Sequence, residues 1–349
     1  MPSTLQVLSP VMLKLPVDKC EHFPTDVHRL DPEGDVTLML TRLLAYVDGP
    51  DMVTEGPVSD MRVKIEIDNV MIEEEVLIHV SSRHMTLASS VFRAMLQQQF
   101  AESNTLSLTG RVDIALPDDD PDALLILLNI IHGRVRKVPL RVDLSTLTQL
   151  AILVDKYDVH EAVELFSTFW FDNLKSTIPS HFTNDIPAWI CICWVFNRPE
   201  EFSIVTRLAL RQGKQAIPLG ELPIPSAVVE AIDLRRQEIL SRLMDTLYSH
   251  IDDYTNNEHC SFECDALMLG SLIKRLRTLK IFPHRPDPPF IGLCFDELDN
   301  RFRQGMYFPA AQRTSIYFYE HSKCAIRSLD STLKKCNERL AGLNLSDFK

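Results

Sequence analysis

The spacing of the apolar residues changes once along this chain, and that change restricts its fold more than any other feature. Before residue 117, apolar and polar residues alternate over short stretches such as Val63-Lys64-Ile65-Glu66-Ile67, the two-residue period of a half-buried strand. From Asp120 onward, apolar residues recur every three to four positions, which is the spacing of a helix face. The sequence therefore predicts an α+β protein, with a small sheet near its N-terminus and helices through the rest.

Residue types mark where these elements begin and end. Asp120 before Pro121 predicts a helix start, and His132-Gly133 predicts its end. The segment Thr41 to Met61 is expected to be an insertion between two strands, and its two Gly-Pro steps predict that its middle is loop. Leu43, Leu44 and Tyr46 either extend the first strand or pack locally. Strands are expected at 36–40, 63–68, 75–80 and 112–116. The first helix is expected after the Ser81-Ser82 step, with apolar residues at Ala88, Val91, Phe92 and Met95.

Length and composition indicate two compact units. A chain of 349 residues is longer than one hydrophobic core usually serves. Eleven glycines against 21 prolines favour helices with sharp ends over many tight hairpins. We expect a flexible lead-in over 1–30, a mixed strand-and-helix domain over 31–178 that contains the 41–61 insertion, and an all-helical domain over 179–349.

The negative charge of the chain is concentrated in its first half. The net charge is −12, and up to Ser180 there are 15 basic and 27 acidic residues, which leaves 21 of each beyond it. Acidic surface repels phosphate backbones, so we expect no direct nucleic-acid binding. We interpret the basic cluster as a solvated helix face; its members are Lys274, Arg275, Arg277 and Lys280.

Two observations concern location. No apolar stretch approaches the length needed to cross a bilayer, so we expect no membrane association. The N-terminal residues lack the basic start and apolar block of a secretory signal, which predicts a cytoplasmic or nuclear protein with reduced thiols.

The common catalytic signatures are missing from the sequence. It contains no glycine-rich phosphate or dinucleotide loop, no Gly-x-Ser-x-Gly and no His-Glu-x-x-His. The acidic run Asp118 to Asp122 matches a helix start, where carboxylates complement the helix dipole, better than a cation site. We therefore expect no enzyme; an active site assembled from distant residues of the C-terminal half is the remaining alternative.

Two short pairs of metal-ligand residues stand in the C-terminal half. Cys260 and Cys264 are four apart, and His321 and Cys324 are three apart, so each pair can present both side chains on one side of a turn. Together they would complete a closed, structural zinc site. The alternative is that they are core thiols and a chance histidine. The residues His259, His284 and Cys294 compete for the same roles.

Four blocks in the first half carry a family resemblance. They are Asp35-Val-Thr-Leu, Val80-Ser-Ser-Arg-His-Met-Thr-Leu-Ala-Ser-Ser-Val-Phe-Arg-Ala-Met-Leu96, Leu116-Pro-Asp-Asp-Asp-Pro-Asp-Ala-Leu124 and Ile131-His-Gly133. Followed by Leu150 to Val159, they resemble a BTB/POZ domain of the fungal type. The match departs from the common animal form in two ways. That form has a histidine at the position of Ser81 and a proline at that of Ser90, and the 41–61 insertion is unusual.

The second half also resembles a known group. Its order Cys260-x3-Cys264-Asp265, Leu269-Gly270, His321-x2-Cys324 and Gly342 to Phe348 is similar to the C-terminal half of many uncharacterised fungal BTB proteins. This resemblance implies a helical domain and assigns it no activity.

The BTB resemblance implies a non-catalytic protein-interaction protein that forms homodimers, and an apolar lead-in (Val7, Leu8, Val11, Met12, Leu13) is available for the dimer contact. It also implies a substrate adaptor for a cullin ubiquitin ligase, with Phe100 and Glu102 in the hydrophobic-x-acidic step after the first helix pair. One alternative is that Phe100 packs under its loop and Glu102 is solvated. Another is a transcriptional or signalling scaffold without ubiquitin chemistry.

Overall fold

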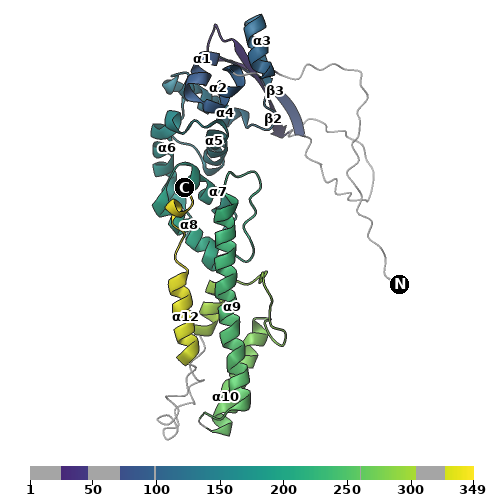
Figure 1. Ribbon diagram of the computed structural model, residues 1–349, viewed down its shortest axis with the longest axis vertical. Coiled ribbons are helices and arrows are strands. Elements are labelled where there is room, and N and C mark those ends of the chain that lie inside the picture. The colour runs from purple at the N-terminus through teal and green to yellow at the C-terminus, as the bar shows by residue number, and fades with distance from the viewer. Residues whose placement is uncertain (1–24, 46–70, 98–99, 260, 304–326) are drawn as a thin grey trace, which may run out of the picture.

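The computed structural model describes residues 25–45, 71–97, 100–259, 261–303 and 327–349. The molecule is elongated: a small sheet and the first helices form one end, and a long helix leads to α10 at the other end (Figure 1). A sheet followed by helices confirms the predicted α+β class. The strand expected at 63–68 and most of the 41–61 insertion lie outside the described residues.

Among the described residues, four strands form one sheet in the order β1-β3-β2-β4. Strand β1 is parallel to β3, β2 is antiparallel to β3, and β2 is parallel to β4. Alternate side chains, such as Val36, Leu38 and Leu40 of β2, are buried against the helices, as the two-residue period predicts. The strands are β1 (Thr25–Arg29), β2 (Val36–Ala45), β3 (Met71–Val80) and β4 (Val112–Ala115).

Regular structure begins earlier than the sequence indicated. Strand β1 lies inside the 1–30 lead-in that was expected to be flexible, ahead of the first strand expected at 36–40. Its position is fixed by pairing with β3 and by Asp26, which accepts a hydrogen bond from Arg42 of β2 at 3.1 Å. Strand β2 also continues to Ala45, so Leu43 and Leu44 extend the first strand, which was one of the two alternatives for the start of the 41–61 insertion.

Six helices accompany the sheet. They are α1 (Ser82–Ala88), α2 (Ser90–Gln97), α3 (Ala101–Thr109), α4 (Pro121–Ile131), α5 (Leu144–Tyr157) and α6 (His160–Leu174). The predicted caps of α4 are confirmed: the Asp120 carboxylate accepts a hydrogen bond from the N–H of Ala123, and His132 ends the helix. The one helix expected after the Ser81-Ser82 step is divided into two, because an extended residue, Ser89, separates α1 from α2.

The described residues of the second half form helices joined by loops, with no strand among them. Its helices are α7 (Ile186–Val195), α8 (Pro199–Gln212), α9 (Ser226–Asn256), α10 (Phe262–Thr278), α11 (Phe295–Arg303) and α12 (Arg327–Arg339). Helix α9 is 31 residues long, and α10 and α12 pack against it (Figure 1). None of the helices in the described ranges is long and apolar enough to cross a membrane.

The final residues leave α12 and return toward α7 and α8 (Figure 1). We call residues 340–349 the C-terminal segment. Its Leu343 N–H donates to the buried Thr206 hydroxyl of α8 at 2.9 Å, and Leu340, Leu343 and Leu345 are buried. Gly342 passes so close to α8 that an added Cβ would lie 1.8 Å from the Ser203 carbonyl oxygen. Only glycine fits there.

Candidate functional site

The predicted partner contact lies at the start of α3. Phe100 caps this helix with extended backbone, and its side chain is 52% exposed instead of packing under the loop. Glu102 stands in the first helical turn, where its charge is also favourable to the helix dipole. The structure thus brings together an exposed aromatic ring and an acidic side chain that are two residues apart.

Helix α3 is attached to the molecule by few side chains. Ser103 is buried and Leu106 packs against the core, while Leu108 at the far end of the helix is 86% exposed. Gly110 closes the helix with a left-handed φ of 76° and donates its N–H to the Leu106 carbonyl oxygen. The helix therefore presents most of its length outward.

Three of the blocks that carry the family resemblance meet in space. Asp35, just before β2, accepts hydrogen bonds from the Ser82 N–H at 2.7 Å and the Ser82 hydroxyl at 2.6 Å, which anchors the start of α1. The Ser81 N–H donates to Nε2 of His132, which ends α4, at 3.0 Å. The sequence separates these residues widely, so spacing alone does not reveal that they share one junction.

The acidic run before α4 has a structural role. Asp120 caps the helix, and Asp119 is buried, where it accepts hydrogen bonds from the Tyr157 hydroxyl and from the Lys156 amine at 2.6 Å. Burial and the neighbouring Asp119 carboxylate raise the pKa of Tyr157, so its phenol stays protonated. These contacts account for Asp119 and Asp120 without a bound cation.

Of the four predicted zinc ligands, only Cys264 lies among the described residues. Cys260, His321 and Cys324 lie outside the described residues. Cys264 is buried in the first turn of α10, next to Asp265. The competing ligand His259 contacts two carboxylates. Its ring Nε2 lies 2.9 Å from the Asp253 carboxylate, and its backbone N–H donates to the Asp265 carboxylate at 2.6 Å. Within the described ranges, no three candidate ligands form a metal-binding group.

The other cysteines in view are buried thiols. Cys191 and Cys193 of α7 are buried in the core, and burial raises the pKa of Cys191 to about 12. Cys294 and Cys336 are also buried and free. Such thiols are poor nucleophiles, because the reactive thiolate is disfavoured.

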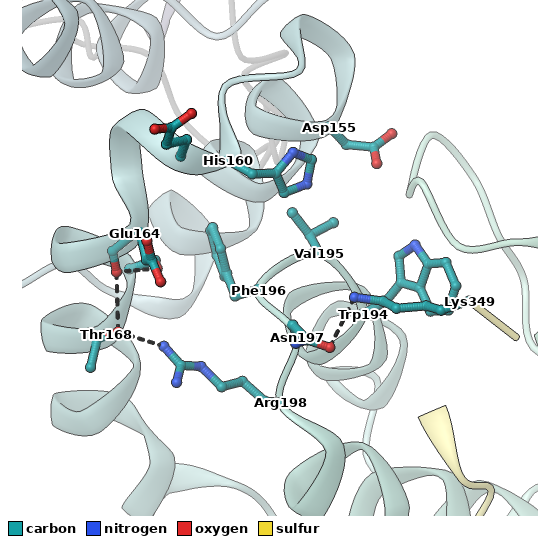
Figure 2. Close-up of a pocket in the computed structure, with 12 residues that line it drawn as sticks. Asp155, His160, Glu164, Thr168, Trp194, Val195, Phe196, Asn197, Arg198 and Lys349 are labelled. Atoms are coloured by element: carbon teal, nitrogen blue, oxygen red, sulfur yellow. Dashed lines mark hydrogen bonds between the residues drawn. The ribbon is translucent and has the colours of Figure 1, made fainter. Parts of the chain in front are cut away.

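A cleft of about 630 Å³ lies where the two expected domains meet. One wall is formed by α5 and α6, and the other by the turn between α7 and α8 together with Lys349 (Figure 2). The acidic side chains stand on the first wall and the cations of the second wall face them. Those residues are Asp155, Glu161 and Glu164 on one side and Arg198 and Lys349 on the other.

The cations of the cleft are held by neutral groups. Arg198 donates to the Thr168 hydroxyl at 2.9 Å and lies over the Phe171 ring. Lys349 donates to the Asn197 amide oxygen at 3.0 Å and lies over Trp194; desolvation lowers its pKa (Figure 2). The lining holds no cysteine, and its hydroxyls, Ser167 and Thr168, are bonded to the backbone or to Arg198.

This cleft was not predicted. Its lining residues are spread along the chain from Asp155 to Lys349. No short motif marks the cleft, because the approach of α6 to the α7–α8 turn creates it. Its facing charges are suited to binding a partner's charged side chains.

Comparison with known proteins adds no relative. No protein-family model matches this chain, and no curated protein matches it.

Proposed function

We propose that the chain is a non-catalytic protein-interaction protein with an N-terminal BTB/POZ-type domain over 31–178. The order of elements supports this proposal: a β2–β3 pair, two short helices, α3, β4 and then paired helices follow one another, with the quoted blocks at their junctions. A cytoplasmic or nuclear location belongs to the same proposal.

The exposed Phe100 ring carries the proposal of an adaptor. An aromatic side chain that is 52% exposed beside an acidic residue is the kind of anchor that partner proteins bury. The proposed partner is a cullin, with Phe100 entering an apolar pocket and Glu102 pairing with a basic rim.

Co-purification from the native cell tests this contact. A cullin is expected with the unmodified chain and is expected to be lost with Phe100→Ala combined with Glu102→Ala. Leu108→Ala is the matched control, because it removes another exposed apolar side chain from the same helix. Circular dichroism checks that all variants remain folded. If the unmodified chain brings down no cullin, the scaffold without ubiquitin chemistry replaces the adaptor.

Self-association is the second part of the proposal. Across the outer face of the sheet, one register row is apolar and is left exposed or half-buried by the described elements; it consists of Val27, Leu77, Met39 and Ala115. The apolar lead-in residues 7–13 lie outside the described residues. A second copy of the chain is the proposed occupant of this face.

Light scattering gives the test of self-association. The expected mass is twice 39.9 kDa at tens of micromolar protein. Val27→Asp is expected to weaken the dimer, while deletion of residues 1–24 tests the lead-in without removing β1. A monomeric unmodified chain would contradict self-association.

A structural zinc ion held by Cys260, Cys264, His321 and Cys324 remains a proposal supported by their sequence spacing. Elemental analysis of untagged protein is expected to find one zinc per chain, lost in Cys264→Ser. Cys336→Ser, at another buried thiol, is the control and should retain the metal. Unmodified protein that contains no metal would contradict the proposed zinc site.

A further inference from the structure

A basic pocket lies in the helical half, away from the sites described above. It has a volume of about 260 Å³ and is formed where the ends of α8 and α10 approach α11. Three cations from these three places line it: Lys214 follows α8, Lys280 follows α10, and Arg301 belongs to α11. Residues that are far apart in sequence thus place like charges around one concavity.

The charges of this pocket are incompletely neutralised. Lys214 lies 3.1 Å from the Glu297 carboxylate, the one acidic side chain in the lining. Asp299, further along α11, is paired with Arg303. Among the described residues, neither Lys280 nor Arg301 has a carboxylate within ion-pair distance or an acceptor for its side chain. The pocket therefore carries a net positive charge, and a concave wall focuses that field.

Lys280 stands at a backbone position that is unfavourable for a residue with a side chain. Lys280 has a left-handed φ of 59° at the C-terminus of α10, where glycine is the usual residue. The turn is closed by hydrogen bonds from the Lys280 N–H to the Arg277 carbonyl oxygen and from the Ile281 N–H to that of Leu276. A strained non-glycine residue with an exposed cation points to a role for its side chain.

We propose that this pocket binds a phosphate group. The Arg301 guanidinium and the Lys280 amine, together with Lys214, which also pairs with Glu297, complement the negative charge of a phosphate monoester. The small volume of the pocket suits the size of that group. The phosphate belongs either to a small metabolite or to a phosphorylated side chain of a protein. This inference does not rest on the proposed BTB function and stands if that function fails.

Calorimetric titration of the full chain with inorganic phosphate at low ionic strength tests the pocket. Lys280→Gly and Arg301→Gln are each expected to weaken binding about tenfold, since each removes a charged hydrogen bond. Glu297→Gln is expected to strengthen it, because it frees Lys214. Lys274→Gln, an exposed lysine of α10 outside the lining, is the control and should leave binding unchanged.

Lys280→Gly separates binding from folding. Glycine relieves the left-handed backbone, so the thermal midpoint should stay the same or rise while phosphate binding weakens. A phosphoserine peptide with neutral flanks, compared with free phosphoserine, then distinguishes the two sources. Tighter binding of the peptide assigns a phosphorylated protein, and equal binding assigns a small molecule. No saturable phosphate binding, or binding that Lys280→Gly and Arg301→Gln leave intact, overturns the proposal.

Discussion

Arg236 shows how much one buried side chain can organise. It is 2% exposed on α9 and donates hydrogen bonds to Asp233 and to three carbonyl oxygens of the loop before α11. Those acceptors belong to Pro289, Phe290 and Leu293. The loop therefore takes its course from a residue more than 50 positions earlier.

We predict that Arg236→Ala lowers the free energy of unfolding by about 3 kcal/mol, because it leaves Asp233 and buried carbonyl oxygens without their donor. Urea unfolding measures the change. Arg235→Ala, at the neighbouring position, has no such partners among the described residues and should change the free energy by less than about 0.5 kcal/mol. Equal effects of the two substitutions would contradict the assigned role.

His132 predicts how stability depends on pH. Its Nε2 accepts the Ser81 N–H, and its Nδ1 faces the Leu128 carbonyl oxygen at 2.8 Å, which fixes the neutral ring with a proton on Nδ1. Burial lowers the pKa of His132 below 6.5; nearby His84 and Arg134 act in the same direction, and Asp31 opposes them.

Because the folded-state pKa is the lower one, the neutral ring stabilises the fold above pH 6.5, and this contribution is lost as the pH falls through the folded pKa. The free energy of unfolding, measured from pH 7 to pH 5, should therefore fall more for the unmodified chain than for His132→Gln. Parallel pH profiles would show that His132 contributes nothing to the dependence.

At the scale of elements, the break between α1 and α2 is set by a tertiary contact. Ser89 is fully buried; its hydroxyl donates to the Tyr157 carbonyl oxygen of α5 at 2.6 Å and accepts the Phe92 N–H at 3.0 Å. The Phe92 ring stacks on Tyr157, 4.4 Å between centroids. One serine thus ends α1, caps α2 and binds both to α5.

Ser89→Ala is expected to lower the free energy of unfolding by about 2 kcal/mol, because it removes a cap and leaves a buried carbonyl oxygen unpaired. Thermal and urea unfolding provide the measurement. Ser90→Ala removes only the exposed bond to Asp158 and should cost about 0.5 kcal/mol. A smaller effect at Ser89 than at Ser90 would rule out this explanation.

These contacts explain which elements the sequence could predict. The caps of α4 and α5 were predictable, because Asp120 and Asp143 act on N–H groups three residues away. The break at Ser89 was not predictable, because Tyr157, the hydrogen-bond partner of Ser89, lies 68 residues later and the apolar spacing continues across the break. Strand β1 was missed for the same reason: its pairing with β3 depends on residues 50 positions away.

At the scale of the whole molecule, the C-terminal segment fastens the end of the helical half to α8. We predict that Gly342→Ala lowers the free energy of unfolding by about 2 kcal/mol, because the new methyl group collides with the Ser203 carbonyl oxygen. Hydrogen exchange should show loss of protection at Leu343, whose N–H bonds Thr206.

A second glycine-to-alanine substitution, in α10, is the control. Gly270 has open space around it, so Gly270→Ala should raise stability by about 0.5 to 1 kcal/mol through helix propensity. Destabilisation at both positions, or at neither, would contradict the close approach of Gly342 to α8. Neither this approach nor the cleft beside Lys349 leaves a local sequence signal, since their partners lie more than a hundred residues apart.

The length of α9 also affects how the size of the protein must be measured. A helix of 31 residues is about 46 Å long, and the sheet and the first helices lie beyond its N-terminal end, which makes the molecule elongated (Figure 1). The molecule therefore diffuses more slowly than a sphere of its mass. A single copy elutes early from a gel-filtration column and imitates a dimer, so only a direct measurement of mass counts the chains in solution.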